Sequence, residues 1–497
     1  MKSHFDVLII GAGLSGIGMA CQLAKACPSK RVAVLERRQR IGGTWDLFRY
    51  PGIRSDSDMV TFGYSFRPWR QNKVLADGPE IRQYIEDAAR EHGVDRWIRY
   101  GTMIDGANWS TAHRCWTVHA HDEASGEKLS FTCKQLVACT GYYNHDQGYL
   151  PTFPGEEQFK GLRIHPQQWP ENLDYRDKRI VVIGSGATAV TLIPAMCDKA
   201  AHITMLQRSP SYVMTVPGYD KVAAALGYVL PANWVYGLAR WRNLRLQQGI
   251  YKAARRWPRQ VRSWLLSHVQ KQLGREVDMQ HFTPKYNPWD ERLCAVPDGD
   301  LFRVLREGKA SVVTDQINTF TENGILLQSG KHLDADIVIT ATGLQLQSLG
   351  GMRLSVDGEK VEPGKLMTYK GVLLQNVPNF AYLFGYTNAP WTLKVEMSAD
   401  YLCRLWRHMD AVGSDVMTAR APAGEKLDES VLGSLQSGYA QRGQALLPRQ
   451  GRSLPWRVLN NLKADRTMLL RDAVTDAALE LRGPGQPKTA SFPRRAA

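Results

Sequence analysis

FDVLIIGAGLSGIGMACQLAKACPSKRVAVLE, residues 5–36, is the stretch that decides the fold of this chain. Its apolar run 5–10 is followed by a glycine-rich turn, by a predicted helix over 14–26 and by a second apolar run over 31–35. Short apolar runs bounded by turn residues are typical of buried parallel strands. The order of strand, glycine turn, helix and strand therefore predicts a βαβ unit.

The glycine turn and the acidic residue that ends this unit predict a dinucleotide site. Gly11, Gly13 and Gly16 permit a tight turn, and the helix that follows offers backbone N–H groups to a pyrophosphate. Ser15 in the same turn is a further candidate contact. Glu36 lies 20 residues after Gly16, where a carboxylate accepts hydrogen bonds from ribose hydroxyls.

A second βαβ unit is predicted farther along the chain. The apolar run 179–183 leads into GSGATA at 184–189 and a helix that ends near Asp198, and another strand covers 202–206. The candidate contacts for a dinucleotide in this unit are Gly184, Gly186, Ala187 and Thr188.

The residue that follows the second strand differs in charge between the two units. Glu36 stands there in the first unit, whereas Arg208 and Ser209 stand there in the second. A carboxylate repels a 2′-phosphate, and an arginine binds it with two hydrogen bonds. The first unit is therefore predicted to bind FAD and the second to bind NADPH.

Two further apolar runs end in Thr-Gly, at 136–141 and 336–343. Segments of this kind close the nucleotide domains of flavoproteins that hold two dinucleotides. Separately, a β-meander is expected between residues 102 and 132. We therefore expect an α/β fold with two Rossmann-like domains, the second inserted in the first. The predicted division is an FAD-binding domain over 1–146 and 341–497, an NADPH-binding domain over 147–209 and 294–340, and a helical insertion over 210–293.

Composition excludes several classes of protein. The chain has 497 residues, of which 43% are apolar and 22% charged, with 14 Trp, so it is neither collagen-like nor largely disordered. Its eight cysteines are scattered without a CxxC pair, so we expect neither a disulfide scaffold nor a metal site. The first apolar run ends in glycines instead of a cleavage site, which favours a cytoplasmic protein. No nucleic-acid-binding motif is present, and no such partner is expected.

The net charge of +15 is concentrated between residues 221 and 275, which contain 11 Lys and Arg and no Asp or Glu. Within it, 222–239 is uncharged, but Pro231 interrupts it and its 18 residues are marginal for crossing a bilayer. Amphipathic helices are expected instead. Two interpretations stay open: peripheral contact with the inner face of a membrane, and a solvated basic face at the entrance for NADPH.

Two longer motifs carry a family resemblance. FKGLRIHPQQWP at 159–170 matches FxGxxxHxxxWP, and GGTWDLFRYPGIRSD at 42–56 matches GGxWxxxxYPGxxxD. With these motifs between the glycine loops, the chain resembles the Baeyer–Villiger flavin monooxygenases, and within them the mycobacterial branch that activates ethionamide. The resemblance implies that reduced FAD and O2 form a C4a-peroxyflavin, which converts ketones to esters or lactones. Sulfoxidation of thioethers is the implied side activity.

The resemblance also implies roles for individual residues. Arg292 holds the positive charge that favours the deprotonated peroxide, and Asp56 orients that guanidinium and contacts the cofactor. Glu291 stands where many relatives have lysine, so the 2′-phosphate depends more on Arg208. Further implied cofactor contacts are Gly43, Thr44, Trp45, His165 and Trp169. Of these, His165 couples the linker that contains the 159–170 motif to NADP binding. The implied substrate pocket contains Trp289, Tyr386, Asn388 and Trp391.

Three other functions were weighed against this one. An S- or N-oxygenating flavin monooxygenase shares both glycine loops, but Trp169-Pro170 and Arg292 favour Baeyer–Villiger chemistry. A disulfide reductase needs a redox cysteine pair soon after the first unit, and Cys21 and Cys27 lie in or just after its helix instead. A membrane-associated NADPH and FAD sensor without catalysis is the non-enzyme alternative.

Overall fold

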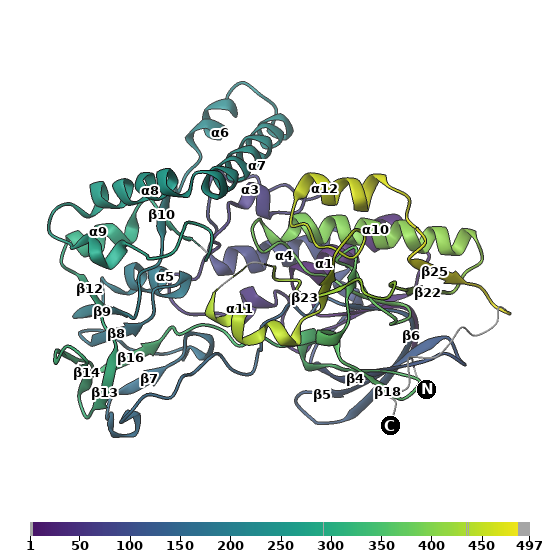
Figure 1. Cartoon of the computed structure of the whole chain (residues 1–497), viewed down its shortest axis with the longest axis horizontal. Helices are drawn as coiled ribbons and strands as arrows, with labels where there is room; N and C mark the ends of the chain where they lie inside the picture. The colour runs from purple at the N-terminus through teal and green to yellow at the C-terminus, as the bar shows by residue number, and fades with distance from the viewer. Residues whose placement is uncertain (1–2, 292, 434, 436, 486–497) are drawn as a thin grey trace.

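The computed structural model describes residues 3–291, 293–433, 435 and 437–485. Its larger sheet contains the first βαβ unit as predicted, and Figure 1 shows this sheet on the right. Strand β1 pairs in parallel with β2 on one side and β6 on the other, so that Val7 lies opposite both Val32 and Gln135. The parallel strands are β1 (Ser3–Ile10), β2 (Val32–Leu35), β3 (Ile98–Arg99), β6 (Lys128–Ala138) and β21 (Phe380–Tyr382).

The predicted β-meander extends this sheet. Antiparallel pairing joins β4 (Thr102–Ser110) to β5 (Cys115–Asp122) and β5 to β6. Trp109 and Trp116 face each other across the first pair and are buried. Later parts of the chain add β17 (Arg353–Val356) and the edge strand β18 (Glu359–Val361) beside β4. The strands β19 (Thr368–Tyr369) and β20 (Leu373–Leu374) branch off through β21, which pairs with β6.

The second predicted unit forms a separate, fully parallel sheet. Its strand order is β12-β9-β8-β16-β7, and helices α5 (Ala187–Met196) and α9 (Asp300–Arg306) pack beside it. Helix α5 ends two residues before the predicted end at Asp198. The strands are β7 (Leu162–Ile164), β8 (Arg179–Ile183), β9 (His202–Gln207), β12 (Ala310–Thr314) and β16 (Ile337–Thr340). A small antiparallel sheet covers it with β13 (Ile317–Thr321), β14 (Gly324–Leu327) and β15 (His332–Asp334).

The two sheets divide the sequence in the predicted nested order. All strands of the parallel second sheet come from residues 162–340, and the larger sheet takes its strands from before and after that range. The α/β fold with two Rossmann-like units is thereby confirmed. The domain limits at 146, 209, 293 and 340 stay a prediction.

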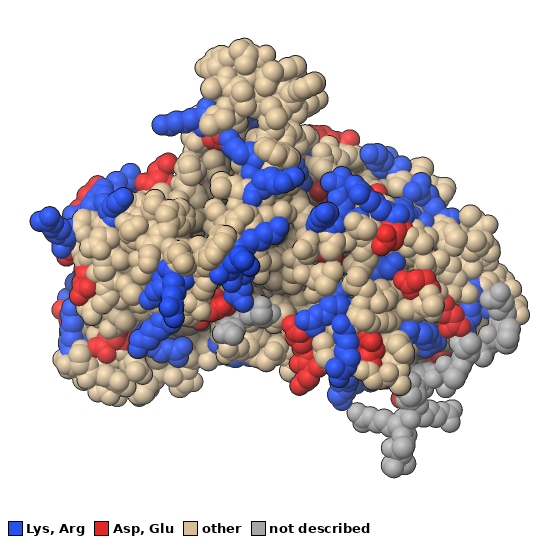
Figure 2. Space-filling view, turned by 45° about the horizontal axis from the view of Figure 1, so that its top comes forward, with Lys and Arg blue, Asp and Glu red and all other residues tan. Residues whose placement is uncertain are grey.

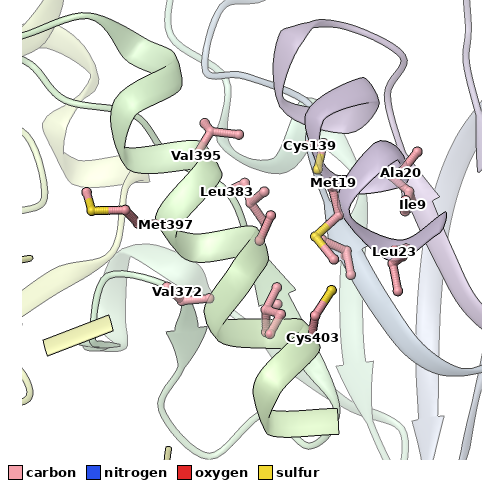
Figure 3. Packing of buried hydrophobic residues seen from close by; sticks show 14 of the residues in the cluster. Ile9, Met19, Ala20, Leu23, Cys139, Val372, Leu383, Val395, Met397 and Cys403 are labelled. Atoms are coloured by element: carbon pink, nitrogen blue, oxygen red, sulfur yellow. The ribbon is translucent and has the colours of Figure 1, made fainter. Parts of the chain in front are cut away.

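Helices α1 (Leu14–Ala26) and α10 (Trp391–Ala411) pack against each other at the centre of the first unit. Figure 3 shows Met19 and Leu23 of α1 near Cys403 of α10, in a cluster that also contains Leu383. Helix α1 has the bounds that its sequence predicted. For α10 the sequence predicts a helix over 394–409, and the helix begins three residues earlier, at Trp391. The helix α4 (Gly78–Glu91) packs against the other side of α1.

A hairpin of two helices stands out from the rest of the molecule at the top of Figure 1. It consists of α6 (Lys221–Leu226) and α7 (Ala232–Arg256), and α8 (Pro258–Leu273) follows. None of the described helices combines the length and apolar character that crossing a bilayer requires. The sequence did not predict strand β10 (Val213–Val216), which precedes the hairpin and pairs with β11 (Cys294–Pro297).

Three short helices are α2 (Thr44–Leu47), α3 (Met59–Phe62) and α12 (Leu462–Arg466). The C-terminal part also contains α11 (Gly438–Gly443), β22 (Val416–Ala419), β23 (Lys426–Ser430), β24 (Arg449–Gly451) and β25 (Leu479–Arg482).

Candidate functional site

A cavity of about 1460 Å³ extends from the first glycine loop to the helices α7 and α8. Pockets for one drug-sized molecule are about 300–1,000 Å³, so this cavity is large enough for a dinucleotide together with a second ligand. It brings together fourteen of the sequence-predicted site residues, namely Gly11, Gly13, Ser15, Glu36, Gly43, Thr44, Trp45, Asp56, Ala187, Thr188, Trp289, Tyr386, Asn388 and Trp391.

The first glycine loop has no room for side chains at Gly11 and Gly16, the first and third glycines of the motif. Gly11 has φ +101°, and a Cβ at Gly16 would lie 1.8 Å from the carbonyl oxygen of Gly11. Gly43 (φ +56°) approaches Gly13 so closely that its Cβ would lie 3.0 Å from the Cα of Gly13. Within the described chain, no side chain caps the N-terminus of α1. Its first backbone N–H groups are therefore available to a phosphate in the cavity.

Glu36 lies at the end of β2, as the βαβ pattern requires, and is 5% exposed. Its carboxylate accepts hydrogen bonds from the backbone N–H of Ala12 (2.6 Å) and of Arg38 (2.9 Å). Burial raises the pKa of Glu36, and these hydrogen bonds oppose the shift. The carboxylate thus fixes the glycine loop while it lines the cavity, and oxygen lone pairs remain for ribose hydroxyls.

The second glycine loop is more open than the first. Gly184 has φ +135°, and its Cβ would lie 2.4 Å from the carbonyl oxygen of Ala341. At Gly186, however, a Cβ would meet no described atom within 4 Å, and no described side chain caps α5. The loop therefore has space for a ligand directly above the helix N-terminus.

Arg208 and Ser209 are exposed at the end of β9, outside the cavity wall. Ser209 accepts a hydrogen bond through its carbonyl oxygen from Ser185 (3.1 Å). Burial raises the pKa of Glu291, and the positive charge of Arg208 opposes that shift. The acidic residue that departs from the family pattern therefore lies within electrostatic reach of Arg208.

The segment Tyr50-Pro51-Gly52 belongs to the GGxWxxxxYPGxxxD motif, which predicts a rigid turn there, and it packs on the second unit. A Cβ at Gly52 would lie 2.7 Å from the backbone oxygen of Thr191 in α5. The hydroxyl of Tyr50 forms a hydrogen bond with Thr188, and burial raises the Tyr50 pKa to about 12. This segment thus connects the two nucleotide folds.

Arg54 continues this connection and was not predicted as a site residue. It lines the cavity and forms a 2.9 Å ion pair with Asp300 at the start of α9. Its Nε and Nη2 atoms are buried and make no hydrogen bond within the described chain. Three N–H groups on two nitrogens of a buried guanidinium are therefore left for a bound ligand.

Asp56, two residues later, lines the same cavity, as the resemblance implied. Its implied partner Arg292 lies outside the described residues. Asp58 caps α3 by accepting a hydrogen bond from the backbone N–H of Thr61 (3.0 Å). It also accepts one from Asn243 of α7 (2.9 Å), so that the helical hairpin is tied to the segment that carries Asp56.

Aromatic residues form the wall of the cavity beside the first glycine loop. The Nε1 of Trp391 donates to the hydroxyl of Ser15 (2.8 Å), and the indole stacks on Tyr142 at 5.4 Å. The predicted residue Trp45 packs edge to face on Phe62 at 5.9 Å. The flat faces of Trp391 and Tyr142 are suited to contact with an aromatic ring system in the cavity.

Tyr386 belongs to a buried polar triad that the sequence did not predict. Its hydroxyl donates to Asp465 (2.7 Å), and Lys394 donates to the other carboxylate oxygen (2.6 Å). Asp465 is fully buried, and burial lowers the pKa of Lys394 and raises that of Tyr386. The Oδ1 atom of the neighbouring Asn388 is buried and has no partner among the described residues.

Trp289 lies at the far end of the cavity, where its ring packs edge to face on Tyr251 of α7. Its φ of +68° is rare for a large side chain, and strain of this kind is frequent at ligand sites. The predicted substrate residues therefore lie at both ends: Tyr386, Asn388 and Trp391 near the first loop, and Trp289 near the hairpin.

His165 and Trp169 lie in the linker, away from the cavity wall. His165 is hydrogen-bonded through Nε2 to the carbonyl oxygen of Gly343 (3.2 Å), and its Nδ1 accepts from the backbone of Gln167. Burial lowers the pKa of His165, which the bond to Gly343 opposes. Gly343 follows strand β16 of the second sheet, so His165 connects the linker to the chain crossing between the folds.

Comparison with known proteins gives one consistent result. A family model described as flavin-binding monooxygenase-like matches residues 5–379. The putative FAD-containing monooxygenase MymA of Mycobacterium tuberculosis is 57% identical, over 99% of this chain and its own full length. The FAD-containing monooxygenase EthA of the same organism is 49% identical, over 96% of this chain and 98% of its own. The solved structure of a steroid monooxygenase bound to NADP superposes with a TM-score of 0.77 at 21% identity, over 97% of this chain and all of that one.

Proposed function

The chain belongs to the flavin-binding monooxygenase-like family, and from this premise we propose that it is an FAD- and NADPH-dependent Baeyer–Villiger monooxygenase. Its substrates are ketones, which it converts to esters or lactones with O2. The observation that carries the proposal is the continuous cavity, which joins the first glycine loop, the N-terminus of α5 and the Asp56 segment.

The residues present fit both cofactors. The tight loop around Gly11, Gly16 and Gly43 is a cradle that a single Cβ would fill, and the uncapped α1 faces it. The open space at Gly186 above the uncapped α5 serves the second dinucleotide. When bound, FAD supplies the chemistry that activates O2, and NADPH supplies the reducing equivalents.

This chain's own residues orient the reactants and shield them from water. Ser15, held by Trp391, and Glu36, held by Ala12, fix the loop that would hold FAD. The buried N–H groups of Arg54 place positive charge in the cavity two residues from Asp56, and positive charge favours an anionic reacting oxygen. The aromatic wall at Trp391 excludes water from that region.

NADPH oxidation by the purified yellow protein in air tests the proposal, with 2-octanone or phenylacetone present or absent. We expect oxidation that depends on the ketone and a matching amount of ester by mass spectrometry. An Arg292→Ala variant should then release hydrogen peroxide instead of ester. NADPH consumption that yields only peroxide with ketones, together with sulfoxide from thioethers or N-oxide from amines, would replace the proposal by an S- or N-oxygenating monooxygenase.

A further inference from the structure

The α6–α7 hairpin (residues 221–256) exposes large apolar side chains that no described residue covers. Tyr228 is 91% exposed and Val229 is 76% exposed in the turn between the helices. Trp234, Leu238 and Trp241 on α7 are exposed as well. At 100° per residue these three side chains lie on one face of α7, opposite the face on which Ala239 and Asn243 are packed. A soluble protein rarely presents a contiguous apolar surface of this kind without a partner.

The same exposed face of α7 is cationic in its second half. Arg245, Lys252 and Arg256 continue the stripe of Trp234, Leu238 and Trp241, and all three are exposed. None of the three forms an ion pair with a described residue, and Arg245 and Arg256 cover the rings of Trp241 and Trp257. Figure 2 shows the protruding tip without charged side chains and Lys and Arg gathered around its base. Tryptophan and arginine in this arrangement suit the boundary between lipid tails and anionic headgroups.

The cavity opens beside this surface. Its wall includes Tyr219, Val222 and Leu246, which are 52%, 56% and 59% exposed. Val222 belongs to α6 and Leu246 to α7, so this opening lies between the two helices of the hairpin. From here the wall continues inward with aliphatic and aromatic side chains, among them Met214, Val216, Ile250 and Tyr251.

We propose that the tip of the α6–α7 hairpin inserts into the surface of an anionic phospholipid bilayer, and that the cavity takes up substrates with long alkyl chains directly from the lipid. The absence of any acidic residue from 221 to 275 provides the charge complementarity. The inference rests on the proposed function for the chemistry of the substrate, but the binding of the hairpin to lipid does not depend on it. Of the two interpretations of the basic helices, this proposal selects membrane contact and gives it a geometry. Only the tip enters the lipid, while Arg245, Lys252 and Arg256 stay among the headgroups.

Flotation of the FAD-loaded full chain with vesicles tests the binding. At low salt, we expect the protein to float with vesicles of phosphatidylcholine and phosphatidylglycerol in equal parts and to stay behind with phosphatidylcholine alone. Trp234→Ser/Trp241→Ser should weaken binding about tenfold or more. Arg245→Gln/Lys252→Gln should weaken it about fivefold for each charge.

Matched controls are available elsewhere on the surface. Leu150→Ser/Leu446→Ser removes two side chains that are 52% and 48% exposed, and Lys128→Gln/Lys331→Gln removes two exposed cations. Both variants should float like the wild type. The binding part is overturned if the wild type remains unbound with anionic vesicles, or if the tryptophan variant binds as tightly as its control. Flavin absorbance and circular dichroism confirm that each variant is folded.

A pair of substrates tests the entry route. The tryptophan variant should oxidise water-soluble 2-butanone at the wild-type rate, while its kcat/KM for 2-tetradecanone dissolved in anionic vesicles should fall about tenfold. Equal kcat/KM values of the tryptophan variant and the wild type for the vesicle-borne ketone would overturn entry from the lipid. Failure of every ketone, with intact flotation, would overturn the proposed function and leave the membrane contact standing.

Discussion

The two βαβ units follow the same pattern, but they differ at the third position of the glycine loop. Gly16 stands there in the first unit and Ala189 in the second. A Cβ at Gly16 would lie 1.8 Å from the oxygen of Gly11, whereas the methyl of Ala189 is buried without displacing its loop. The first loop is closed around its helix and held by Glu36, and the second is open at Gly186. We interpret the closed unit as the site of a permanently held cofactor and the open unit as the site of one that exchanges.

Exchanging the residues at this position should give the largest effect. Gly16→Ala places a methyl where the oxygen of Gly11 lies, so the loop must move away from α1. We expect loss of bound FAD, measured by the absorbance of the purified protein, and a destabilisation above about 4 kcal/mol. Ala189→Gly should retain FAD and lose about 1 kcal/mol of helix stability. Retention of FAD by Gly16→Ala at wild-type stability would remove the difference between the units.

The ion pairs near the two units differ in the same direction. The pair of Lys394 in α10 and Asp465 in α12, beside the first unit, is almost fully buried, while Lys309–Asp198 at the second unit is exposed. Lys394→Met leaves the buried Asp465 carboxylate without its counterion, with the Tyr386 hydroxyl still donating to it, and we expect a loss of about 3–5 kcal/mol in chemical denaturation at neutral pH. Lys309→Met should change stability by at most about 1 kcal/mol. Similar losses of stability in both variants would contradict the contrast between a closed first unit and an open second unit.

Substitutions in the open unit should change the affinity for the cofactor instead of the stability of the fold. Arg208→Ala removes the charge expected to bind the 2′-phosphate, and should raise the KM for NADPH about 10- to 100-fold. The KM for NADH should stay within about twofold. Glu291→Gln removes the acid that faces Arg208, and should lower the KM for NADPH. Equal increases for NADPH and NADH after Arg208→Ala would show that Arg208 does not contact the phosphate.

The sequence predicted the parts of this comparison that depend on local pattern. The bounds of α1 and the position of Glu36 at the end of β2 follow from residues within one βαβ unit. The first three residues of α10 were missed, and there Trp391 forms a side-chain hydrogen bond with Ser15, 376 residues away, which no local pattern reveals. The triad of Tyr386, Asp465 and Lys394 was missed for the same reason, since Asp465 stands in the unremarkable stretch LKADR and its partners are 79 and 71 residues distant. Arg54 was missed although it lies inside a recognised motif, and its two unpartnered nitrogens became apparent in the structure alone.

The smallest predicted effect concerns the carboxylate that closes the first loop. Burial raises the pKa of Glu36, so the folded chain holds this proton more tightly than the unfolded chain. Its contribution to stability is therefore fully present below the ordinary pKa of glutamate and is lost as the pH rises through the raised pKa. Glu36→Gln still accepts a hydrogen bond from Ala12 but cannot ionise. Without FAD, the stability of the variant relative to wild type should increase over this pH range, by about 1.4 kcal/mol for each unit by which the pKa is raised.

Repeating these unfolding measurements with FAD present decides what Glu36 does beyond holding the loop. Ribose hydroxyls that donate to the carboxylate stabilise its charged form and lower its pKa. The gain of the Gln variant with rising pH should then shrink or disappear when FAD is bound. A gain of the same size with and without FAD would mean that Glu36 serves the closed loop alone, and the contrast with Arg208 would then be one of loop geometry and not of cofactor recognition.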